Sequence, residues 1–339
     1  MKIAVLLINL GSPENASPRK VAGFLYRMLN DVRVIDLPFI IRKLLVNLVI
    51  IPFRVRASSK KYAEYFNGKP SPLLTCSLSV EKKLNEILPS NYRAFSAMRY
   101  GNPSLKTALQ QIIGDKYERI LVFPQYPQYA EAVTLSSIEK AEDIAGRLDK
   151  KVELQIIRNF HDHPLFIECL SNKIRKYNPA DYDRVIFSYH SLPLRQINKV
   201  HARAGQSGCN CSEKTPENSG FCYKAACYET SGLIARDLKL KKDDYLTSFQ
   251  SQMGKNWLQP ATGDVLISEA EKGNKRILIV SPSFVADCLE TTMELGVEYN
   301  DLFRKHGGKC LQPVECLNDD EEWVQALAEM ITTHPFIQA

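Results

Sequence analysis

One histidine, His190, ends an apolar run and is followed directly by a proline-marked turn, in the order Phe187-Ser-Tyr-His-Ser-Leu-Pro193. An imidazole placed at the end of a buried strand can reach a cleft and can exchange protons near neutral pH. The same pattern also suits a structural histidine that is held by hydrogen bonds. The run therefore identifies a candidate general base and leaves both interpretations open.

An acidic stretch follows later in the chain: residues 277–303 contain no lysine or arginine, but they include Asp287 and three glutamates spaced by four, Glu290, Glu294 and Glu298. On an ideal α-helix each successive glutamate turns by about 40°, so all three share one face. A local π-bulge would align them more closely. Like charges at this spacing repel each other, which leaves a solvated helix face or a path for cations or protons as the two interpretations.

Four cysteines lie within nineteen residues of a polar segment rich in glycine, serine and asparagine: Cys209, Cys211, Cys222 and Cys227. Four thiolates can hold tetrahedral zinc or a two-iron two-sulfur cluster, and neither the Cys-x-Cys nor the Cys-x4-Cys spacing is the usual zinc knuckle. Free thiols or disulfides are the alternative. Since a segment so poor in apolar residues gains stability from a crosslink, the spacing favours metal ligation.

Residues 37–63 form a third unusual segment, which contains no acid but six cations among many aliphatic and aromatic residues. This composition suits an apolar ligand that carries carboxylates, or an anionic membrane surface. The alternative is a buried helix whose arginines extend to the solvent. The absence of acids favours a functional lip, which we call the lip segment (residues 37–63).

Bulk composition excludes several classes of protein. The net charge of +6 is spread over 339 residues without dense basic runs, so nucleic acid is not an expected partner. The longest apolar stretch, residues 44–53, is too short to span a bilayer, and the amino terminus does not resemble a signal peptide. We therefore expect a cytoplasmic protein, with peripheral contact at the inner face of the membrane as an open alternative.

Seven short apolar runs alternate with stretches of helical periodicity, which predicts βαβ units and parallel sheets. The runs are residues 3–8, 92–98, 120–124, 152–157, 185–188, 245–249 and 277–281. They divide near residue 155, so we expect two doubly wound α/β domains, 1–155 with the lip segment and 156–339 with a cysteine-rich insertion at 205–228. In such folds ligands bind at the carboxyl ends of the strands, where His190 stands.

Six ordered motifs resemble the ferrochelatase family of porphyrin-metallating enzymes across nearly the whole chain. They are Leu6 to Pro13, Met98 to Pro103, Phe123 to Tyr129, Phe187 to Pro193, Phe249 to Pro260 and Ala286 to Thr291. The resemblance implies two Rossmann-like domains without a bound nucleotide, which agrees with the lack of a Gly-x-Gly-x-x-Gly or phosphate-loop signature. It also implies insertion of Fe²⁺ into a porphyrin, with protoporphyrin IX favoured over coproporphyrin III, as a terminal step of heme biosynthesis.

The same resemblance implies roles for individual residues. His190 and Glu290 would be the catalytic pair, and Asp287, Glu294 and Glu298 would relay metal or protons. The residues expected to bind the porphyrin are Leu10, Arg56, Ser71, Arg99, Tyr100, Tyr126 and Trp257.

Two positions depart from the family pattern. Cys288 stands where many relatives have histidine, which puts a metal role there in doubt. Relatives with a two-iron two-sulfur cluster often take ligands from a carboxyl-terminal extension, whereas this chain has no cysteine after Cys316. An internal cluster on Cys209, Cys211, Cys222 and Cys227 is therefore expected, with structural zinc as the alternative. A chelatase for another metal such as cobalt, and a non-catalytic iron-sulfur or tetrapyrrole carrier, are the competing functions.

Overall fold

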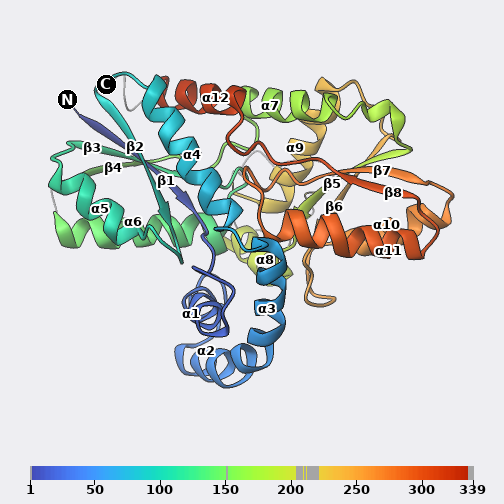
Figure 1. The fold of residues 1–339 in the computed structure, drawn as a ribbon, viewed down its shortest axis with the longest axis horizontal. Helices are drawn as coiled ribbons and strands as arrows, with labels where there is room; N and C mark the ends of the chain where they lie inside the picture. The colour runs from blue at the N-terminus through green and yellow to red at the C-terminus, as the bar shows by residue number, and fades with distance from the viewer. Residues whose placement is uncertain (1, 150–151, 204–208, 210, 212–220, 335–339) are drawn as a thin grey trace. The chain divides into compact units, whose positions relative to one another are not determined.

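The computed structural model of the chain describes residues 2–149, 152–203, 209, 211 and 221–334 (Figure 1). It contains two four-stranded parallel sheets, each within its own compact unit. The first unit comprises Met1–Tyr126, Glu131–Asn159 and Asn318–Ala339, and the second comprises Pro127–Ala130 and Phe160–Leu317. The second predicted domain ran to residue 339, but the structure assigns the last segment to the first unit because helix α12 (Glu321–Thr332) packs on α4 (Pro72–Ile87).

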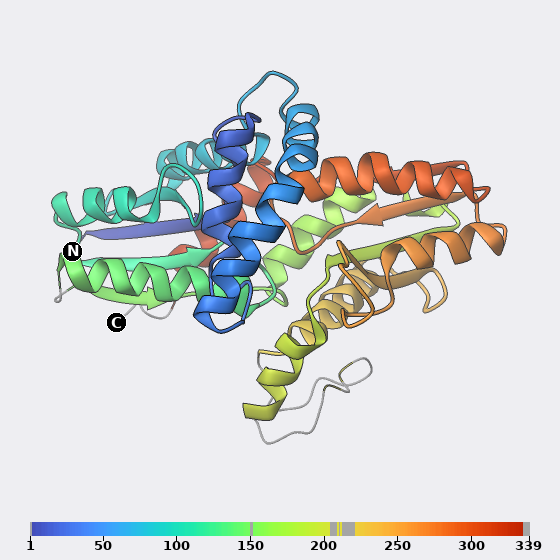
Figure 2. The same ribbon diagram turned by 90° about the horizontal axis from the view of Figure 1, so that it is seen from below.

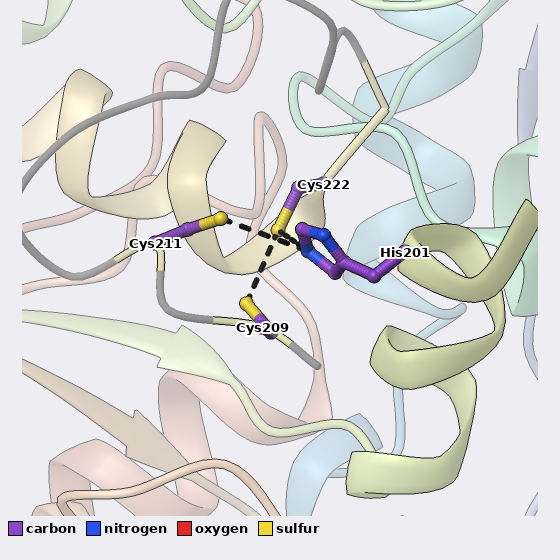
Figure 3. A group of neighbouring side chains, drawn as sticks. All are labelled: His201, Cys209, Cys211 and Cys222. Atoms are coloured by element: carbon purple, nitrogen blue, oxygen red, sulfur yellow. Dashed lines mark hydrogen bonds between the residues drawn. The ribbon is translucent and has the colours of Figure 1, made fainter. Parts of the chain in front are cut away.

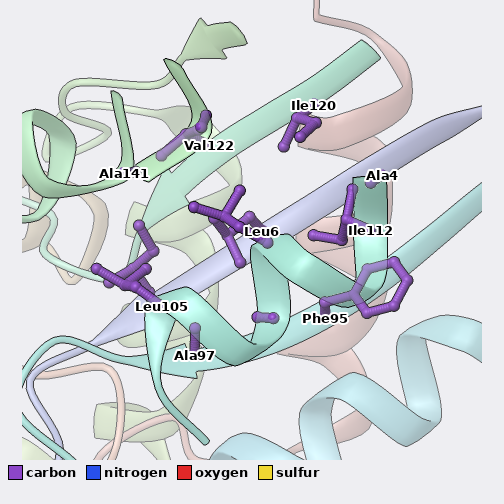
Figure 4. Packing of buried hydrophobic residues seen from close by; sticks show 13 residues of the cluster. Ala4, Leu6, Phe95, Ala97, Leu105, Ile112, Ile120, Val122 and Ala141 are labelled. Carbon is purple, nitrogen blue, oxygen red and sulfur yellow. The ribbon is translucent and has the colours of Figure 1, made fainter. Parts of the chain in front are cut away.

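The first sheet has the strand order β2-β1-β3-β4, with β1 at Ile3–Asn9, β2 at Tyr92–Met98, β3 at Arg119–Pro124 and β4 at Glu153–Ile156. Helices α5 (Leu105–Gly114) and α6 (Ser136–Leu148) cover one face of it. Leu6, Phe95 and Val122 of neighbouring strands meet Leu105 and Ile112 of α5 there, in a core without polar side chains (Figure 4). This burial of aliphatic surface stabilises the sheet from which the site residues project.

The second sheet repeats the order as β6-β5-β7-β8, with β5 at Arg184–His190, β6 at Tyr245–Gln250, β7 at Arg276–Val280 and β8 at Cys310–Pro313. Helices α10 (Thr262–Glu271) and α11 (Tyr299–Lys305) pack on one face through a buried aliphatic core. Helices α7 (Pro164–Arg175), α8 (Leu194–Arg203) and α9 (Tyr223–Asp237), with a 3₁₀ turn at Pro179–Asp181, complete the unit. All seven predicted strands are found, and the short strand β8 was missed.

The lip segment folds into α2 (Phe39–Leu44), the π-helix η1 (Leu45–Ile50) and α3 (Ile51–Phe66). Helix α1 (Pro18–Leu29) packs alongside α3 (Figure 2). The rings of Phe24 and Tyr62 meet edge to face there, with their centroids 6.2 Å apart. A second π-helix, η2 (Glu131–Leu135), precedes α6, and a third, η4 (Glu290–Glu298), precedes α11. Across the described ranges, no helix combines the length and the apolar character needed to cross a membrane.

Candidate active site and candidate metal centre

His190 is the last residue of β5, so its side chain stands at the carboxyl edge of the second sheet. Its Nδ1 lies 2.7 Å from the carbonyl oxygen of Ser191. Because a carbonyl can only accept, Nδ1 must carry the proton in this contact, and the neutral ring then keeps an unprotonated Nε2. The ring of Phe284 packs against the imidazole at 6.3 Å. This arrangement leaves a base of defined tautomer at a strand end.

Two neighbours fix the backbone of His190. The hydroxyl of Tyr223 donates to the His190 carbonyl at 2.8 Å, and the His190 amide donates to the hydroxyl of Ser283 at 3.1 Å. Tyr223 is the first residue of α9, and Ser283 follows β7, so two separate elements hold one strand end. Neither residue was predicted from the sequence, since a lone tyrosine or serine gives no signal before the fold brings it near His190.

A buried polar layer lies between the second sheet and α10, beneath the same strand ends. Ser188 donates to the Gln250 side chain at 2.8 Å, and its hydroxyl lies 2.8 Å from that of Thr262. Ser281 adds a hydrogen bond to the Ser188 carbonyl at 3.0 Å. All four residues are almost fully buried, so their hydrogen bonds lock the ends of β5, β6 and β7 to one another. The sequence analysis did not identify this layer.

The predicted acidic row lies on a helix, and the π-helical alternative is the form found, over Glu290–Glu298. Glu294 in the middle accepts from the Ser251 amide at 2.8 Å and from Tyr299 at 3.0 Å, and also from the Ser251 hydroxyl. Exposure rises along the row, because Glu290 and Glu294 are half-buried whereas Glu298 is exposed. Within the described part of the chain, neither Glu290 nor Glu294 forms an ion pair.

Asp287 stands just before this π-helix and takes part in its local structure. Its Oδ1 accepts from the Thr291 hydroxyl at 3.1 Å and from the Cys316 amide at 3.3 Å.

Burial raises the pKa of Cys288 well above its ordinary value, and the nearby Glu290 carboxylate raises it further. Cys288 is therefore a neutral thiol. His190 ends β5, and Glu290 begins the π-helix that follows the adjacent strand β7, so both lie on the carboxyl side of this sheet. No hydrogen bond joins their side chains within the described chain.

Trp257 belongs to the aromatic segment that follows β6. It forms an isolated antiparallel bridge with Pro193, and on either side Leu194 donates to the Asn256 carbonyl at 2.9 Å and Leu258 to the Leu192 carbonyl at 3.0 Å. The half-buried Trp257 is thus fixed beside the turn that follows His190. The structure therefore places the predicted residue Trp257 next to Pro193, three residues after the predicted residue His190.

In the first unit, Arg99 and Tyr100 follow β2 and converge on one carboxylate. Arg99 pairs with Asp31 at 2.6 Å and also donates to the Ser136 hydroxyl at 2.9 Å, while Tyr100 donates to Asp31 at 2.9 Å. Burial raises the pKa of Tyr100, and the Asp31 charge adds to the shift, so this phenol stays protonated. The Tyr100 amide donates to the Leu10 carbonyl at 3.0 Å. Asp31 and Ser136 organise this cluster and were missed.

The other predicted porphyrin-binding residues of the first unit have different surroundings. Ser71 is buried and caps α4 by accepting from the Leu74 amide, which is a structural role. Arg56 is exposed on α3. Burial raises the pKa of Tyr126, so its hydroxyl remains neutral.

The lip segment presents its apolar side chains to solvent. Phe53 is 82% exposed, Ile40 is 70% exposed and Leu48 is 67% exposed. The interpretation as a buried helix is therefore wrong for this face. Arg42 is also unlike the surface cation that composition suggested, because it is buried and donates to the Leu37 carbonyl at 2.8 Å.

A compact group of metal-binding side chains lies between α8 and α9, made of His201, Cys209, Cys211 and Cys222 (Figure 3). Their ligand atoms all lie within 4.8 Å of one another. Three of the four predicted cysteines are in this group, together with His201, whereas Cys227 is not part of it. Cys227 is fully buried inside α9, where burial raises the pKa of its thiol well above the ordinary value. Most of the predicted insertion, residues 205–208, 210 and 212–220, lies outside the described residues.

The three thiols of this group are electrostatically coupled. The hydrogen bond between Cys209 and Cys222 lowers the pKa of Cys209 to about 5. The same hydrogen bond raises the pKa of Cys222, and burial raises that of Cys211. Without a cation, one thiolate is thus stabilised at the expense of its neighbours, which is the behaviour of thiols packed for a shared positive ion.

Comparison with known proteins gives one family. The sequence profile of the ferrochelatase family matches residues 2–335. The chain belongs to the ferrochelatase family. Ferrochelatases of Legionella pneumophila (strain Lens) and Coxiella burnetii (strain CbuK_Q154) are 39% and 36% identical to it, over 98% and 97% of this chain and 99% and 93% of theirs.

Two solved structures resemble the fold of the chain at low sequence identity. SirB from Bacillus subtilis with Fe³⁺ superposes with a TM-score of 0.56 at 12% identity, covering 98% of this chain and 94% of its own. The sirohydrochlorin chelatase SirB from the subspecies spizizenii, in complex with cobalt, gives 0.51 at 11% identity and covers 100% and 98%. For this ferrochelatase-family chain, the predicted family, the two-sheet α/β fold and the classification as a lyase-type metal chelatase are confirmed.

Proposed function

We propose that the protein inserts Fe²⁺ into protoporphyrin IX, with release of two protons, as a terminal step of heme biosynthesis. The observation that carries the proposal is the fixed tautomer of His190, whose Nδ1 is bound to the Ser191 carbonyl and whose Nε2 is free to accept a proton. This base shares an edge of one sheet with a row of acids that attract a divalent cation. Family membership supports the same reaction.

The exchange of ions follows from charge balance. Two pyrrole N–H protons must leave as Fe²⁺ enters, so the porphyrin centre gains two positive charges and gives up two. His190 accepts one proton at Nε2, and Glu290 accepts the other. Glu294 and the exposed Glu298 continue the row towards solvent. Oxygen ligands bind Fe²⁺ weakly enough to release it, unlike thiolates.

The proposed relay is not uniform along its length. The Glu294 carboxylate is oriented by three hydrogen bonds, and Asp287 is engaged by Thr291 and by the Cys316 amide. We assign Glu290 the catalytic role because, among the described residues, its carboxylate is engaged only by the neighbouring Cys288 thiol, whereas Glu294 has three donors. Asp287 then supports the start of the π-helix, and Glu294 and Glu298 carry protons or metal.

Charge supports protoporphyrin IX over coproporphyrin III as the substrate. Protoporphyrin IX has two propionates at one edge, whereas coproporphyrin III has four distributed around the ring. Of the predicted porphyrin-binding residues only Arg56 and Arg99 are cations, and Arg99 already pairs with Asp31. The exposed aliphatic face of the lip segment matches the apolar edge of protoporphyrin IX.

A metal-insertion assay across both porphyrins, with Fe²⁺ and Co²⁺ supplied separately, tests this function. We expect the highest kcat/KM for Fe²⁺ with protoporphyrin IX. Higher values with coproporphyrin III or with Co²⁺ would reassign the substrate. A carrier would bind the porphyrin without multiple turnovers of metal insertion, so a reaction that stops after one equivalent would overturn the assignment as an enzyme.

We also propose that the lip segment contacts an anionic membrane surface. Its exposed apolar face is accompanied by the exposed cations Arg54, Arg56, Lys60 and Lys61, and the segment contains no acid. An apolar face flanked by cations binds the headgroup region of anionic bilayers. Such contact would be peripheral, since no helix among the described residues could span a bilayer.

Sedimentation with vesicles tests the membrane contact. The unmodified protein should sediment with vesicles that contain phosphatidylglycerol and should be released by salt. Phe53→Glu and Leu48→Glu should weaken binding at least about tenfold, because each places a charge in the inserted face. Ile87→Glu, which changes a side chain 44% exposed on α4, is the matched control and should bind normally. Equal binding by all the variants would exclude the lip as the contact.

We propose in addition that the group of His201, Cys209, Cys211 and Cys222 holds a resident metal centre, separate from the iron that is inserted. The two candidates for this centre are a two-iron two-sulfur cluster and zinc. The donor set fits a metal, because a buried imidazole nitrogen and three sulfurs converge on one point in a polar part of the chain. Such a centre would crosslink α8 to the start of α9.

A further inference from the structure

The group formed by His201, Cys209, Cys211 and Cys222 has the dimensions of a site for one tetrahedral ion. His201 Nε2 lies 3.2 Å from the sulfur of Cys222 and 3.6 Å from that of Cys211, and the sulfurs of Cys209 and Cys222 are 3.6 Å apart. With a metal–sulfur bond of about 2.3 Å and a metal–nitrogen bond of about 2.0 Å, neighbouring donors of a tetrahedral ion lie about 3.5 to 3.8 Å apart. The two separations of 3.6 Å fall in this range, and the separation of 3.2 Å between His201 and Cys222 is somewhat shorter.

A two-iron two-sulfur cluster requires a wider set of ligands. Its four protein ligands are divided between two irons, and bridging sulfides separate the two pairs. Ligands of opposite irons are therefore held further apart than ligands of one ion. Here every ligand atom lies within 4.8 Å of every other, so there is no separation into two distant pairs. A disulfide between two of the cysteines does not explain why the His201 imidazole is directed at the three sulfurs.

We infer that His201, Cys209, Cys211 and Cys222 bind one tetrahedral Zn²⁺ ion, and that His201, rather than Cys227, is the fourth ligand. Three of these residues are almost fully buried, with exposed fractions of 2% for His201, 3% for Cys211 and 2% for Cys222. Buried thiols and an imidazole that point at each other are stabilised when an ion replaces their protons. Figure 3 shows the imidazole, at the end of α8, directed at the three sulfurs.

The proposed zinc site is linked to His190 through two consecutive residues, Cys222 and Tyr223. Cys222 is the N-cap of α9, where its sulfur accepts from the Ala225 amide at 3.5 Å. The next residue, Tyr223, donates to the His190 carbonyl at 2.8 Å. An ion on Cys222 therefore anchors the helix start that holds the catalytic strand end. Tyr223 acts as a positioning residue, and only this part of the inference rests on the proposed function.

Metal analysis of the full-length protein, purified without oxygen, tests the ligand set. We expect one zinc per chain, no acid-labile sulfide and no visible absorption. His201→Ala and Cys211→Ser should lose the zinc, whereas the matched variant Cys227→Ser should retain it. Two irons with two sulfides per chain, or loss of metal in Cys227→Ser but not in His201→Ala, would overturn the inference.

Substitution with Co²⁺ protects the test against variants that fold poorly. The zinc-depleted protein reloaded with Co²⁺ should show the strong visible bands of a tetrahedral thiolate site. His201→Cys, which keeps four donors, should retain such bands at shifted wavelengths, and unchanged bands would remove His201 from the ligand set. Cobalt bound only to carboxylates absorbs weakly, so weak bands alone would also contradict the site.

Kinetics separate the link to His190 from the metal site itself. Tyr223→Phe should keep its zinc but lower kcat for iron insertion about threefold to tenfold, with KM little changed. An unchanged kcat would remove the link and leave the zinc site intact. If the protein had no iron-inserting activity at all, the proposed function would fail while the metal analysis could still succeed.

Discussion

The two sheets have the same strand order, and a π-helix that begins with glutamate follows the third strand of each, η2 after β3 and η4 after β7. The charge around the two π-helices differs. Glu131 of η2 pairs with Arg33 at 3.4 Å, and Arg33 also pairs with Glu139 on α6. Glu290 of η4 has no such ion pair in the described chain. The same strand order is therefore combined with glutamates that pair with an arginine in the first unit and with a glutamate that has no ion pair, within the described chain, in the second.

The difference extends to the residues at the strand ends. In the first unit, Arg99 and Tyr100 share the Asp31 carboxylate, so the cluster after β2 is internally satisfied. In the second unit, His190 keeps a free Nε2 at the end of β5. Glu269 on α10 pairs with Arg184 at the start of β5, so this buried acid has a cationic partner. A divalent cation is expected to bind where the negative charge of the carboxylates is not balanced by nearby arginine or lysine.

The two connections after the first strand also differ. In the first unit the connection from β1 to β2 contains the lip segment, and in the second unit the connection from β5 to β6 contains the metal group of His201 and three cysteines. The lip segment of the first unit and the His201 and cysteine group of the second unit thus occupy the same position in the order of the strands. The fold tolerates long insertions there because the sheet core does not depend on them.

Replacing the first glutamate of each π-helix tests the comparison most strongly. Glu290→Gln should lower kcat about 10² to 10³-fold, since it removes a carboxylate that handles a proton or Fe²⁺. Glu131→Gln should change kcat less than about threefold, because its charge is already neutralised by Arg33. Steady-state iron insertion into protoporphyrin IX measures both. Similar losses in the two variants would show that the halves are not divided in this way.

The internal pairing of the first unit should appear in its stability. Asp31→Asn should lower the free energy of unfolding of that unit by about 2 to 3 kcal/mol, because it leaves Arg99 and Tyr100 without their shared acceptor in a partly buried site. Asp143→Asn is the control, since its pairs with Lys140 and Arg147 are exposed to solvent and should contribute little to stability.

The fluorescence of Trp323, which is buried in α12 of the first unit, reports urea unfolding of that unit in a Trp257→Phe background. Equal stability of Asp31→Asn and Asp143→Asn would contradict the assignment of Asp31 as the organising residue of its cluster.

A smaller effect is expected at the paired end of the second sheet. Burial alone would raise the pKa of Glu269, but hydrogen bonds from Lys272, Arg184 and Asn274 outweigh it and lower the pKa below its ordinary value of 4.5. A lowered folded-state pKa gives stability that is complete above the unfolded-state pKa and is lost as the pH falls through the folded-state value. Glu269→Gln should therefore cost about 1 to 2 kcal/mol at pH 7 and progressively less under acid conditions.

Amide hydrogen exchange of β5 and β7 measures this local stability against pH. The difference between the variant and the unmodified protein should shrink as the pH falls below 4.5. A difference that stays constant with pH would mean that packing, and not the carboxylate charge, is responsible.

Local sequence signals predicted most of the fold. Apolar runs predicted seven strands, and helical periodicity predicted helices between them, because these elements bury aliphatic surface in a regular pattern. Strand β8 was missed because its four residues, Cys310–Pro313, include glutamine and proline. The place of α12 in the first unit could not be predicted, since it depends on contacts far apart in sequence.

The site was predictable only where the chemistry is local. The end of β5 identified His190, and the spacing of the acids identified the shared face on η4. His201 was missed because a histidine eight residues before Cys209 does not form a familiar metal motif, and only the packing of α8 near α9 brings it to the thiols. The hydrogen bonds from Tyr223 and to Ser283 that hold the backbone of His190 likewise depend on tertiary contacts.

The most direct test of the whole account is the rate of iron insertion by His190→Ala. We expect kcat with protoporphyrin IX to fall at least about 10²-fold, since a positioned general base contributes this much, while porphyrin affinity and zinc content stay unchanged. His306→Ala, which changes a half-buried histidine elsewhere in the same unit, should retain normal activity. Full activity in His190→Ala would contradict the claim that the carboxyl edge of the second sheet carries the chemistry.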